Sequence, residues 1–389
     1  MKSVLIAGIA LAVVALLGAD IAASPPDAQP VDGDEQRLWL RAEAEQKVIN
    51  ESGFLYEDAD LDVYLNEVAR KLQPSDDLAG LHVKILVLKD PHLNAFAFPN
   101  GVIYLHSGLL ARMDNEAQLA ALLGHEITHC THQHALKAFR KLKNQSPANT
   151  LQVQEGDGSG NRVDLLSILG PTGALAAITG YTRELEAEAD DSGLQLMVKA
   201  GYDPKEGAKL FDHLKDEIEI QNFKKPFLFE THPNIQERIE SCRRFLETYE
   251  GREGSGIETA RVFLEKIHRL LLENALLDLK TGRFRMAEKG FEKYLSLKPG
   301  DARAYHFLGE TFLQQRDPGR AKAYFARAIE INPAYPDPHQ AIGMIYYKSG
   351  ERERARGYFE TCLALSRTLP DRSYIEAYLA ECKEEHKGE

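Results

Sequence analysis

The sequence predicts a mainly α-helical protein with two folded domains, an α+β domain followed by an array of helical repeats. The chain has 389 residues, which is long for a single hydrophobic core. Apolar residues recur at helical spacing through most of it, and only residues 81–106 show the pattern of short strands. In its last third the sequence repeats with a period of about 34 residues, which indicates a stack of helix pairs.

The composition is that of an ordinary globular protein, with 43% apolar and 27% charged residues. Its 47 basic and 59 acidic residues give a net charge of −12, and no block of Lys and Arg is long enough to follow a phosphate backbone. We therefore expect no nucleic-acid partner.

The first residues are typical of a secretory signal peptide. Lys2 precedes an uncharged run, Val4–Ala19, and small residues follow it up to Ala23. We expect a signal peptide over residues 1–23, with an uncleaved N-terminal membrane anchor as the alternative. No later stretch reaches about 18 consecutive apolar residues, so the exported protein is expected to be soluble or peripherally associated with a membrane.

Pro-rich and Gly-rich stretches mark the expected domain boundaries. A linker, residues 24–34, leads into the α+β domain, residues 35–250, and a second linker, residues 251–260, precedes the repeat domain, residues 261–389. We expect three repeats and a capping helix, Ser373–Glu384. One unit fills all eight signature positions of a tetratricopeptide repeat with Tyr305, Leu308, Gly309, Phe312, Ala321, Phe325, Ala328 and Pro333.

A small sheet is expected before the central helix of the first domain. Asn100-Gly101 joins two β-prone segments, Asn94–Phe98 and Val102–His106, and this dipeptide is a strong hairpin signal because both residues tolerate positive φ.

The central helix is expected to run from Glu116 to about Leu142, with Asp114 or Asn115 as its N-cap. The next segment, Lys143–Asp164, loses all periodicity and is predicted to be a long loop that acts as a lid.

The four cysteines are too few for a disulfide framework, and none forms a CxxC metal pair. Cys362 and Cys382 lie on neighbouring predicted helices, so either a bridge between them or two buried thiols is expected.

The central helix carries the sequence His125-Glu126-Ile127-Thr128-His129. Histidines four residues apart lie on one face of a helix, so both imidazoles can bind one metal ion. Glu126 lies close enough to act on a water molecule at that ion. The pentapeptide is only moderately specific alone, and its place within an amphipathic helix after Gly124 favours a metal site.

A zinc hydrolase needs a third protein ligand. The segment from Glu186 to Asp190 places two carboxylates on one face of a later helix; alone, it is better explained by a solvated acidic face. Coupled to the histidine pair, it predicts Glu186 as a ligand and Asp190 as the acceptor of a ligand histidine's free N–H. His132 and His134 are expected to be surface histidines, with His134 on the opposite side of the helix.

Several segments together resemble the HtpX and Oma-type gluzincin peptidases, over roughly residues 38–250. The matching segments are Asn94 to Gly101, Gly108 to Leu110, Leu123 to Glu126, Tyr181 to Asp190, Ala200 to Pro204, and Thr231 to Pro233 with Arg238 and Ile239. The resemblance implies a minimal helical gluzincin fold with a short sheet, and one zinc ion per chain held by His125, His129 and Glu186. The chain departs from the HtpX and prenyl-protease branches, since their membrane helices are missing from the sequence.

A signal peptide and a tetratricopeptide tail are similar to those of the periplasmic BepA-type branch. That resemblance implies a zinc metalloendopeptidase of the bacterial periplasm, which acts in quality control of outer-membrane protein assembly. We expect Glu126 to act as general base and then as proton donor. Unfolded or misassembled proteins are the expected substrates, bound as an added strand at the edge of Val102–His106, and the repeats are expected to bind envelope assembly proteins.

His232 leaves two functional interpretations and one structural interpretation open. Pro233 biases it toward an extended conformation, so that its ring either takes zinc's open position or hydrogen-bonds the developing oxyanion. An ordinary histidine at a helix start is the third possibility. If His232 is a fourth ligand, the alternative function is a repeat-based chaperone or scaffold without proteolytic activity.

Overall fold

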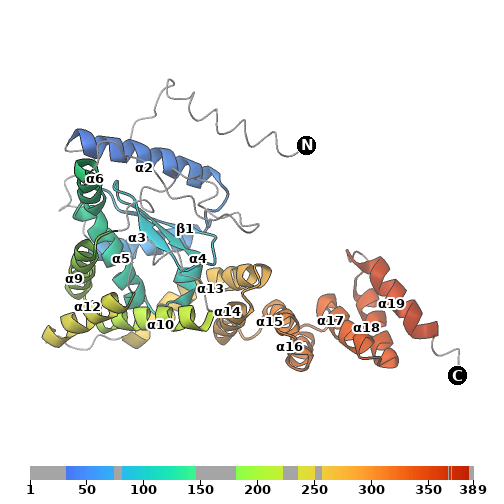
Figure 1. Cartoon of the computed structure of the whole chain (residues 1–389). Helices are drawn as coiled ribbons and strands as arrows, with labels where there is room; N and C mark the ends of the chain where they lie inside the picture. The colour runs from blue at the N-terminus through green and yellow to red at the C-terminus, as the bar shows by residue number, and fades with distance from the viewer. Residues whose placement is uncertain are drawn as a thin grey trace, which may run out of the picture.

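The computed structural model describes residues 32–73, 81–145, 181–221, 235–249, 256–366, 368 and 370–384. Helices dominate, and a small sheet lies inside the first part of the chain, while the last helices extend away from it in a line (Figure 1). The expected mainly α-helical fold is confirmed. Within the described ranges, no helix is long and apolar enough to cross a membrane. The expected signal peptide lies outside these residues.

Two helices begin the first part, α2 (Gly33–Glu51) and α3 (Ala59–Leu72). Each starts at an aspartate whose carboxylate accepts hydrogen bonds from two backbone N–H groups of the first turn, Asp32 for α2 and Asp58 for α3. Because α2 starts at Gly33, the last residues of the expected 24–34 linker are helical.

The sheet has three strands in the order β1-β3-β2. The outer strand β2 (Ala95–Ala97) and β3 (Val102–His106) form the expected antiparallel hairpin, with Gly101 at φ 91° in its turn. On its other side, β3 pairs in parallel with β1 (Lys84–Leu88). The expectation that substrate would add to β3 is therefore wrong, because both edges of this strand are already paired.

Alternate residues of the strands face two different layers. Ile85 and Ile103 pack into the main core with α3 and the helices that follow the sheet, whereas Phe96 and Tyr104 pack in a second cluster that α2 covers. The sheet is thereby buried on both faces, which holds the chain directly after it in a fixed position.

A short helix, α4 (Ser107–Arg112), leads from the sheet to α5 (Glu116–Thr131). The side chain of Asn115 caps α5, as expected. The expected single helix to about Leu142 is wrong, because Gln133 adopts φ 52° and a new helix, α6 (His134–Gln145), begins after it. The first residues of the expected lid belong to α6, and the rest of it lies outside the described residues.

Three helices surround α5 on the side away from the sheet. They are α9 (Arg183–Lys199), α10 (Lys205–Gln221) and α12 (Ile235–Thr248), and Figure 1 shows them side by side below and beside α5. Of these three helices, α9 carries the carboxylates that contact the histidine pair.

The repeats form three helix pairs and a last helix, as expected. The pairs are α13 (Gly256–Lys280) with α14 (Phe284–Leu297), α15 (Ala302–Gln314) with α16 (Pro318–Ile331), and α17 (Pro336–Lys348) with α18 (Arg352–Leu365), followed by α19 (Arg372–Glu384). The signature glycine of the middle pair allows close packing, since a Cβ on Gly309 would lie 2.6 Å from the Phe325 ring. The expected 251–260 linker is too long, because α13 begins at Gly256.

The two cysteines of the last helices lie in one hydrophobic cluster, and Cys362 is a free thiol. The expected bridge to Cys382 is therefore not formed. Burial raises the pKa of Cys362 to about 11, which keeps this thiol protonated and unreactive.

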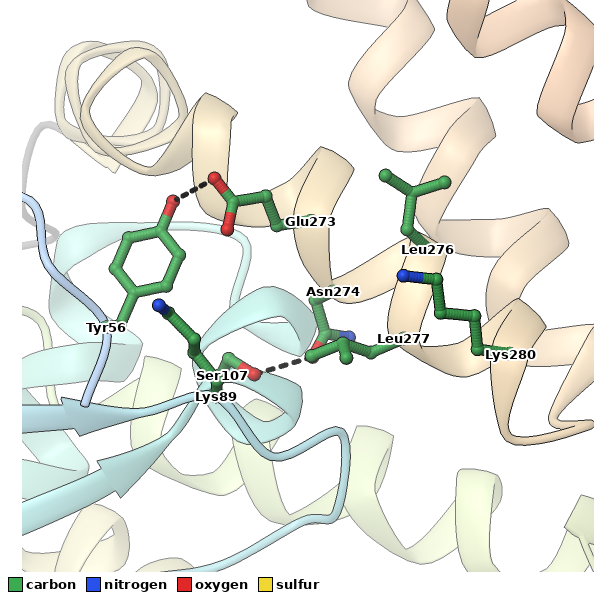
Figure 2. Close-up of a pocket in the computed structure, with 8 residues that line it drawn as sticks. All are labelled: Tyr56, Lys89, Ser107, Glu273, Asn274, Leu276, Leu277 and Lys280. Atoms are coloured by element: carbon green, nitrogen blue, oxygen red, sulfur yellow. Dashed lines mark hydrogen bonds between the residues drawn. The ribbon is translucent and has the colours of Figure 1, made fainter. Parts of the chain in front are cut away.

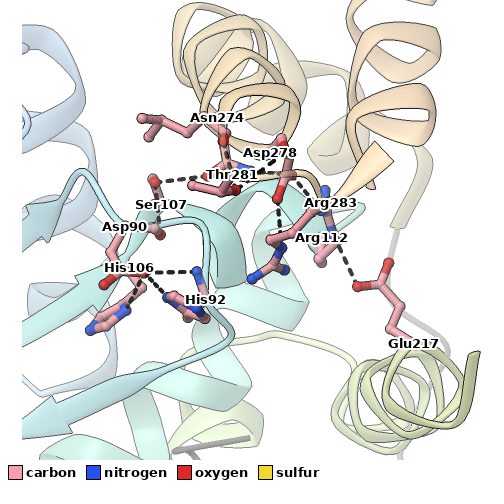
Figure 3. Close-up of polar contacts among 11 residues, drawn as sticks. Asp90, His92, His106, Ser107, Arg112, Glu217, Asn274, Asp278, Thr281 and Arg283 are labelled. Carbon is pink, nitrogen blue, oxygen red and sulfur yellow. Dashed lines mark hydrogen bonds and ion pairs between the residues drawn. The ribbon is translucent and has the colours of Figure 1, made fainter. Parts of the chain in front are cut away.

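The first repeat helix is part of the same core as α5, because Phe263 and Ile267 of α13 pack in the main cluster with Leu119 of α5. Buried polar contacts reinforce this junction (Figure 3). Arg112 pairs with Asp278 of α13 at 2.9 Å and with Glu217 of α10 at 3.0 Å. These contacts fix the direction in which the repeats leave the first domain.

Replacement of Arg112 by Met is expected to destabilise the protein by about 3–5 kcal/mol, because the buried carboxylates of Asp278 and Glu217 lose the cation that they share, and each keeps one other basic partner. Urea unfolding would show this as a lower midpoint. Arg327→Met is the control, since Arg327 is exposed and contacts Glu330 and the Tyr305 ring at the surface, so its loss should leave the midpoint nearly unchanged. Equal midpoints for both variants would contradict the structural role of Arg112.

Candidate metal centre

The candidate metal centre depends on the crossing of α5 and α9. At the crossing, Gly124 faces Gly193, and a Cβ built on Gly124 would lie 2.7 Å from the carbonyl oxygen of Gly193. A Cβ on Gly193 would lie 2.8 Å from the backbone nitrogen of His125. Two glycines are therefore required for the helices to approach this closely, and the approach brings Glu186 of α9 to the histidines of α5.

Three donor atoms converge there. The Nε2 atoms of His125 and His129 lie 3.0 Å apart; Nε2 of His125 lies 3.6 Å from one carboxylate oxygen of Glu186, and Nε2 of His129 lies 3.6 Å from the other. All three side chains are buried. Ligand atoms of a tetrahedral zinc site with bonds of about 2.0–2.1 Å are about 3.3 Å apart, so the spacing fits one ion.

Each histidine is held in place through its other ring nitrogen. Nδ1 of His125 lies 2.9 Å from an oxygen of Asp190, and Asp190 also accepts two hydrogen bonds from Arg238. Burial alone would raise the pKa of Asp190, but Arg238 and His125 hold this pKa below its usual range, so the carboxylate stays ionised. Nδ1 of His129 lies 2.8 Å from Nδ1 of His134.

The structure corrects the expected position of His134, which is fully buried rather than at the surface. Helical spacing fails at this residue because Gln133 interrupts the helix and turns the ring back toward His129. Burial lowers the pKa of His134 to about 4, so its ring is neutral and can accept a hydrogen bond at one nitrogen. His132 remains partly exposed, as its surface assignment requires.

Two further residues complete the surroundings of the donors. Glu126 has an exposed fraction of 0% on α5, directly after His125. The ring of Tyr181, just before α9, stacks on the His129 ring with centroids 4.0 Å apart. Burial raises the pKa of Tyr181 well above its usual value, so the phenol keeps its proton.

The donor set fits zinc better than calcium or magnesium. Two imidazole nitrogens and one carboxylate are ligands of catalytic zinc sites, whereas Ca²⁺ and Mg²⁺ prefer oxygen ligands throughout. The thiol of Cys130 contacts the carbonyl oxygen of Phe98 instead of the donors. When bound here, zinc supplies a Lewis acid that polarises a carbonyl group and activates water.

Sequence reasoning assigned no role to His134, Arg238 or Tyr181. A signal for Arg238 was present, because it follows Thr231 to Pro233 in the segment that resembles the usual end of the family domain. His232 lies outside the described residues. The cavity in Figure 2, which Tyr56, Ser107 and Glu273 help to line, has a volume of about 150 Å³. It is smaller than usual ligand pockets and lies at the junction with α13.

Known families match both parts of the chain. Residues 56–245 match the model of Peptidase family M48, and residues 272–336 and 312–382 match two tetratricopeptide-repeat models. The fold and the site thus define a metallopeptidase domain joined to helical repeats. The chain contains a peptidase family M48 domain followed by tetratricopeptide repeats, as the motifs predicted.

Curated relatives carry names of proteases, two of them of metalloproteases. The "Beta-barrel assembly-enhancing protease" of Escherichia coli (strain K12) is 27% identical over 253 residues, which are 61% of this chain and 50% of that protein. The "Mitochondrial metalloendopeptidase OMA1" of Schizosaccharomyces pombe is 28% identical over 184 residues, 47% of this chain and 52% of that protein. "Metalloprotease LoiP" of Escherichia coli (strain K12) is 28% identical over 180 residues, 46% of this chain and 68% of that protein. The chain spans about half the length of the first curated relatives it matches.

Gly193→Ala is expected to lower zinc affinity on the order of 10–100-fold, because the added Cβ pushes α9 and Glu186 away from His125. The same change should destabilise the fold by about 1–3 kcal/mol. Competition with a fluorescent chelator measures the affinity. Gly357→Ala is the control, since no atom lies within 4 Å of the Cβ at that helical position. Unchanged zinc affinity in Gly193→Ala would show that the crossing does not position the ligand.

Proposed function

We propose that this protein is an exported zinc endopeptidase that cleaves unfolded or misassembled proteins. The carrying observation is the convergence of His125, His129 and Glu186 on one point, with Glu126 buried beside them. The peptidase family M48 match and the metalloprotease relatives support a protease. The proposed site holds one zinc ion per chain.

In the proposed reaction, Glu126 takes the proton of the attacking water and delivers it to the leaving amine. Its place next to His125 on the rigid helix α5 positions the carboxylate for both transfers. Asp190 and Arg238 hold the His125 ring, and Tyr181 covers the His129 ring, so the ligands need little reorganisation. The buried setting excludes bulk water from these contacts.

We propose that substrate binds along β2 in place of the expected β3. His106 donates to the carbonyl oxygen of Asn94, and Phe98 donates to that of Val102, so the intervening pair Phe96 and Tyr104 is also bonded. The backbone groups of Ala95 and Ala97 therefore point away from β3. Both residues are buried, so main-chain pairing there requires the groups that cover this edge to move aside; it would then capture an extended chain with little regard for its sequence.

We infer that the protein acts in the bacterial periplasm, on the assembly of outer-membrane proteins. The signal-like N-terminus and the relatives named for enhancing beta-barrel assembly support this location and role. The repeats are proposed to bind envelope assembly proteins. Helices α15 and α17 border a groove of about 650 Å³ whose polar residues include Glu310, Asp337, Gln340 and Lys348, which offers charged and amide groups to a peptide.

Glu126→Gln is expected to abolish casein cleavage, at least about 1,000-fold, while one zinc ion per chain stays bound, because Glu126 acts on water and is not a ligand. Glu186→Ala should lose that zinc. Glu188→Ala, matched in chemistry and on another face of α9, should keep it. Plasma emission spectroscopy after dialysis measures the metal. Activity in Glu126→Gln, or zinc loss in Glu188→Ala alone, would contradict the assignment.

Removal of the outer repeats by a cut after Gly300, which keeps α13 and α14, is expected to weaken partner binding and to preserve peptide cleavage. A cut after Gly256 would remove α13, whose Phe263 and Ile267 belong to the catalytic core, and should unfold the protein. Pull-down from envelope extracts and hydrolysis of a short fluorogenic peptide measure the two properties. Unchanged pull-down after the Gly300 cut would contradict the role of the outer repeats.

A further inference from the structure

A second group of metal-binding side chains lies next to the candidate centre. His132, at the C-terminal end of α5, His134 of α6 and Glu188 of α9 place one donor atom each within 4.8 Å of one another. Nδ1 of His132 lies 2.7 Å from one oxygen of Glu188, and Nε2 of His134 lies 3.5 Å from the other. These two separations bracket the spacing of about 3.3 Å in a tetrahedral zinc site.

The buried histidine of this group lacks a hydrogen bond at one nitrogen. His134 has an exposed fraction of 0%, and its Nε2 atom has no hydrogen-bond partner among the described residues. A buried polar atom without a partner is unfavourable unless a ligand satisfies it. Glu188 and His132 remain partly exposed, so solvent can reach the group and supply the remaining ligand.

We propose that the protein has a second, weaker zinc site, formed by His132, His134 and Glu188. Zinc bound there disturbs the first site. Two imidazoles and a carboxylate select a borderline divalent cation such as zinc. The affinity should be lower than at the first site, because Lys137 lies 3.5 Å from Glu188 and competes for its carboxylate.

The two sites are coupled through the contact between His129 and His134. Their Nδ1 atoms lie 2.8 Å apart, so one hydrogen occupies this contact. With His129 bound to zinc through Nε2, its hydrogen is on Nδ1 and is donated to His134, whose own hydrogen is on Nε2. A cation that takes Nε2 of His134 moves that hydrogen to Nδ1, where it meets the hydrogen of His129. Occupancy of the second site therefore breaks the contact that orients His129.

Equilibrium dialysis of full-length Glu126→Gln protein against rising free zinc tests the site without self-cleavage. We expect one zinc ion per chain first and a second at higher free zinc. His132→Ala should weaken the second binding at least tenfold and leave the first unchanged. Lys137→Gln should tighten the second binding severalfold, because the competing ammonium is gone. A plateau at one zinc in Glu126→Gln, or a second binding unaffected by His132→Ala, would overturn the proposal.

The inference that the second zinc inhibits cleavage rests on the proposed function. It is measured separately, with protein that keeps Glu126 and with a fluorogenic peptide. Cleavage should fall at least fivefold as the second zinc binds, and His132→Ala should retain its rate over the same range of free zinc. Equal inhibition in both proteins would refute the coupling. A protein without peptidase activity would refute the proposed function, while the dialysis result would still decide whether the second site exists.

Discussion

The contact between Gly124 of α5 and Gly193 of α9 is the constraint on which the rest of the site depends. It sets the distance between α5, which carries two of the three donors, and α9, which carries the third, and no side chain larger than hydrogen fits at either position. From this crossing, α9 presents Asp190 to His125, Glu186 to His125 and His129, and Glu188 to His132 and His134. One backbone contact thus positions the ligands, the acceptor behind His125 and the second group of metal-binding side chains.

The junction with the repeats extends the same rigidity outward. Apolar residues of α13 belong to the catalytic core, and Arg112 links that helix to α10 through two buried ion pairs. A buried arginine with two carboxylates specifies geometry more than it adds stability. The repeats therefore extend from the metallopeptidase domain in a fixed direction, and a partner held in their groove keeps a fixed position relative to the site.

Local signals in the sequence predicted much of this structure. The Asn-Gly hairpin, the Asn115 cap, the helix pairs and the histidine pair each depend on residues close in sequence. Three features were not predictable in this way. Gln133 interrupts the helix, so a prediction from continuous helical spacing placed His134 on the wrong side. The parallel pairing of β1 with β3 depends on chain topology. The Arg112–Asp278 pair joins residues far apart in sequence. His232 remains a prediction.

The central claim is that His125, His129 and Glu186 hold zinc, and X-ray absorption at the zinc edge of the protein with one zinc per chain tests it most directly. The predicted spectrum contains two imidazole rings and oxygen neighbours at about 2.0–2.2 Å, without sulfur. A sulfur neighbour at about 2.3 Å, or a single imidazole, would contradict the account.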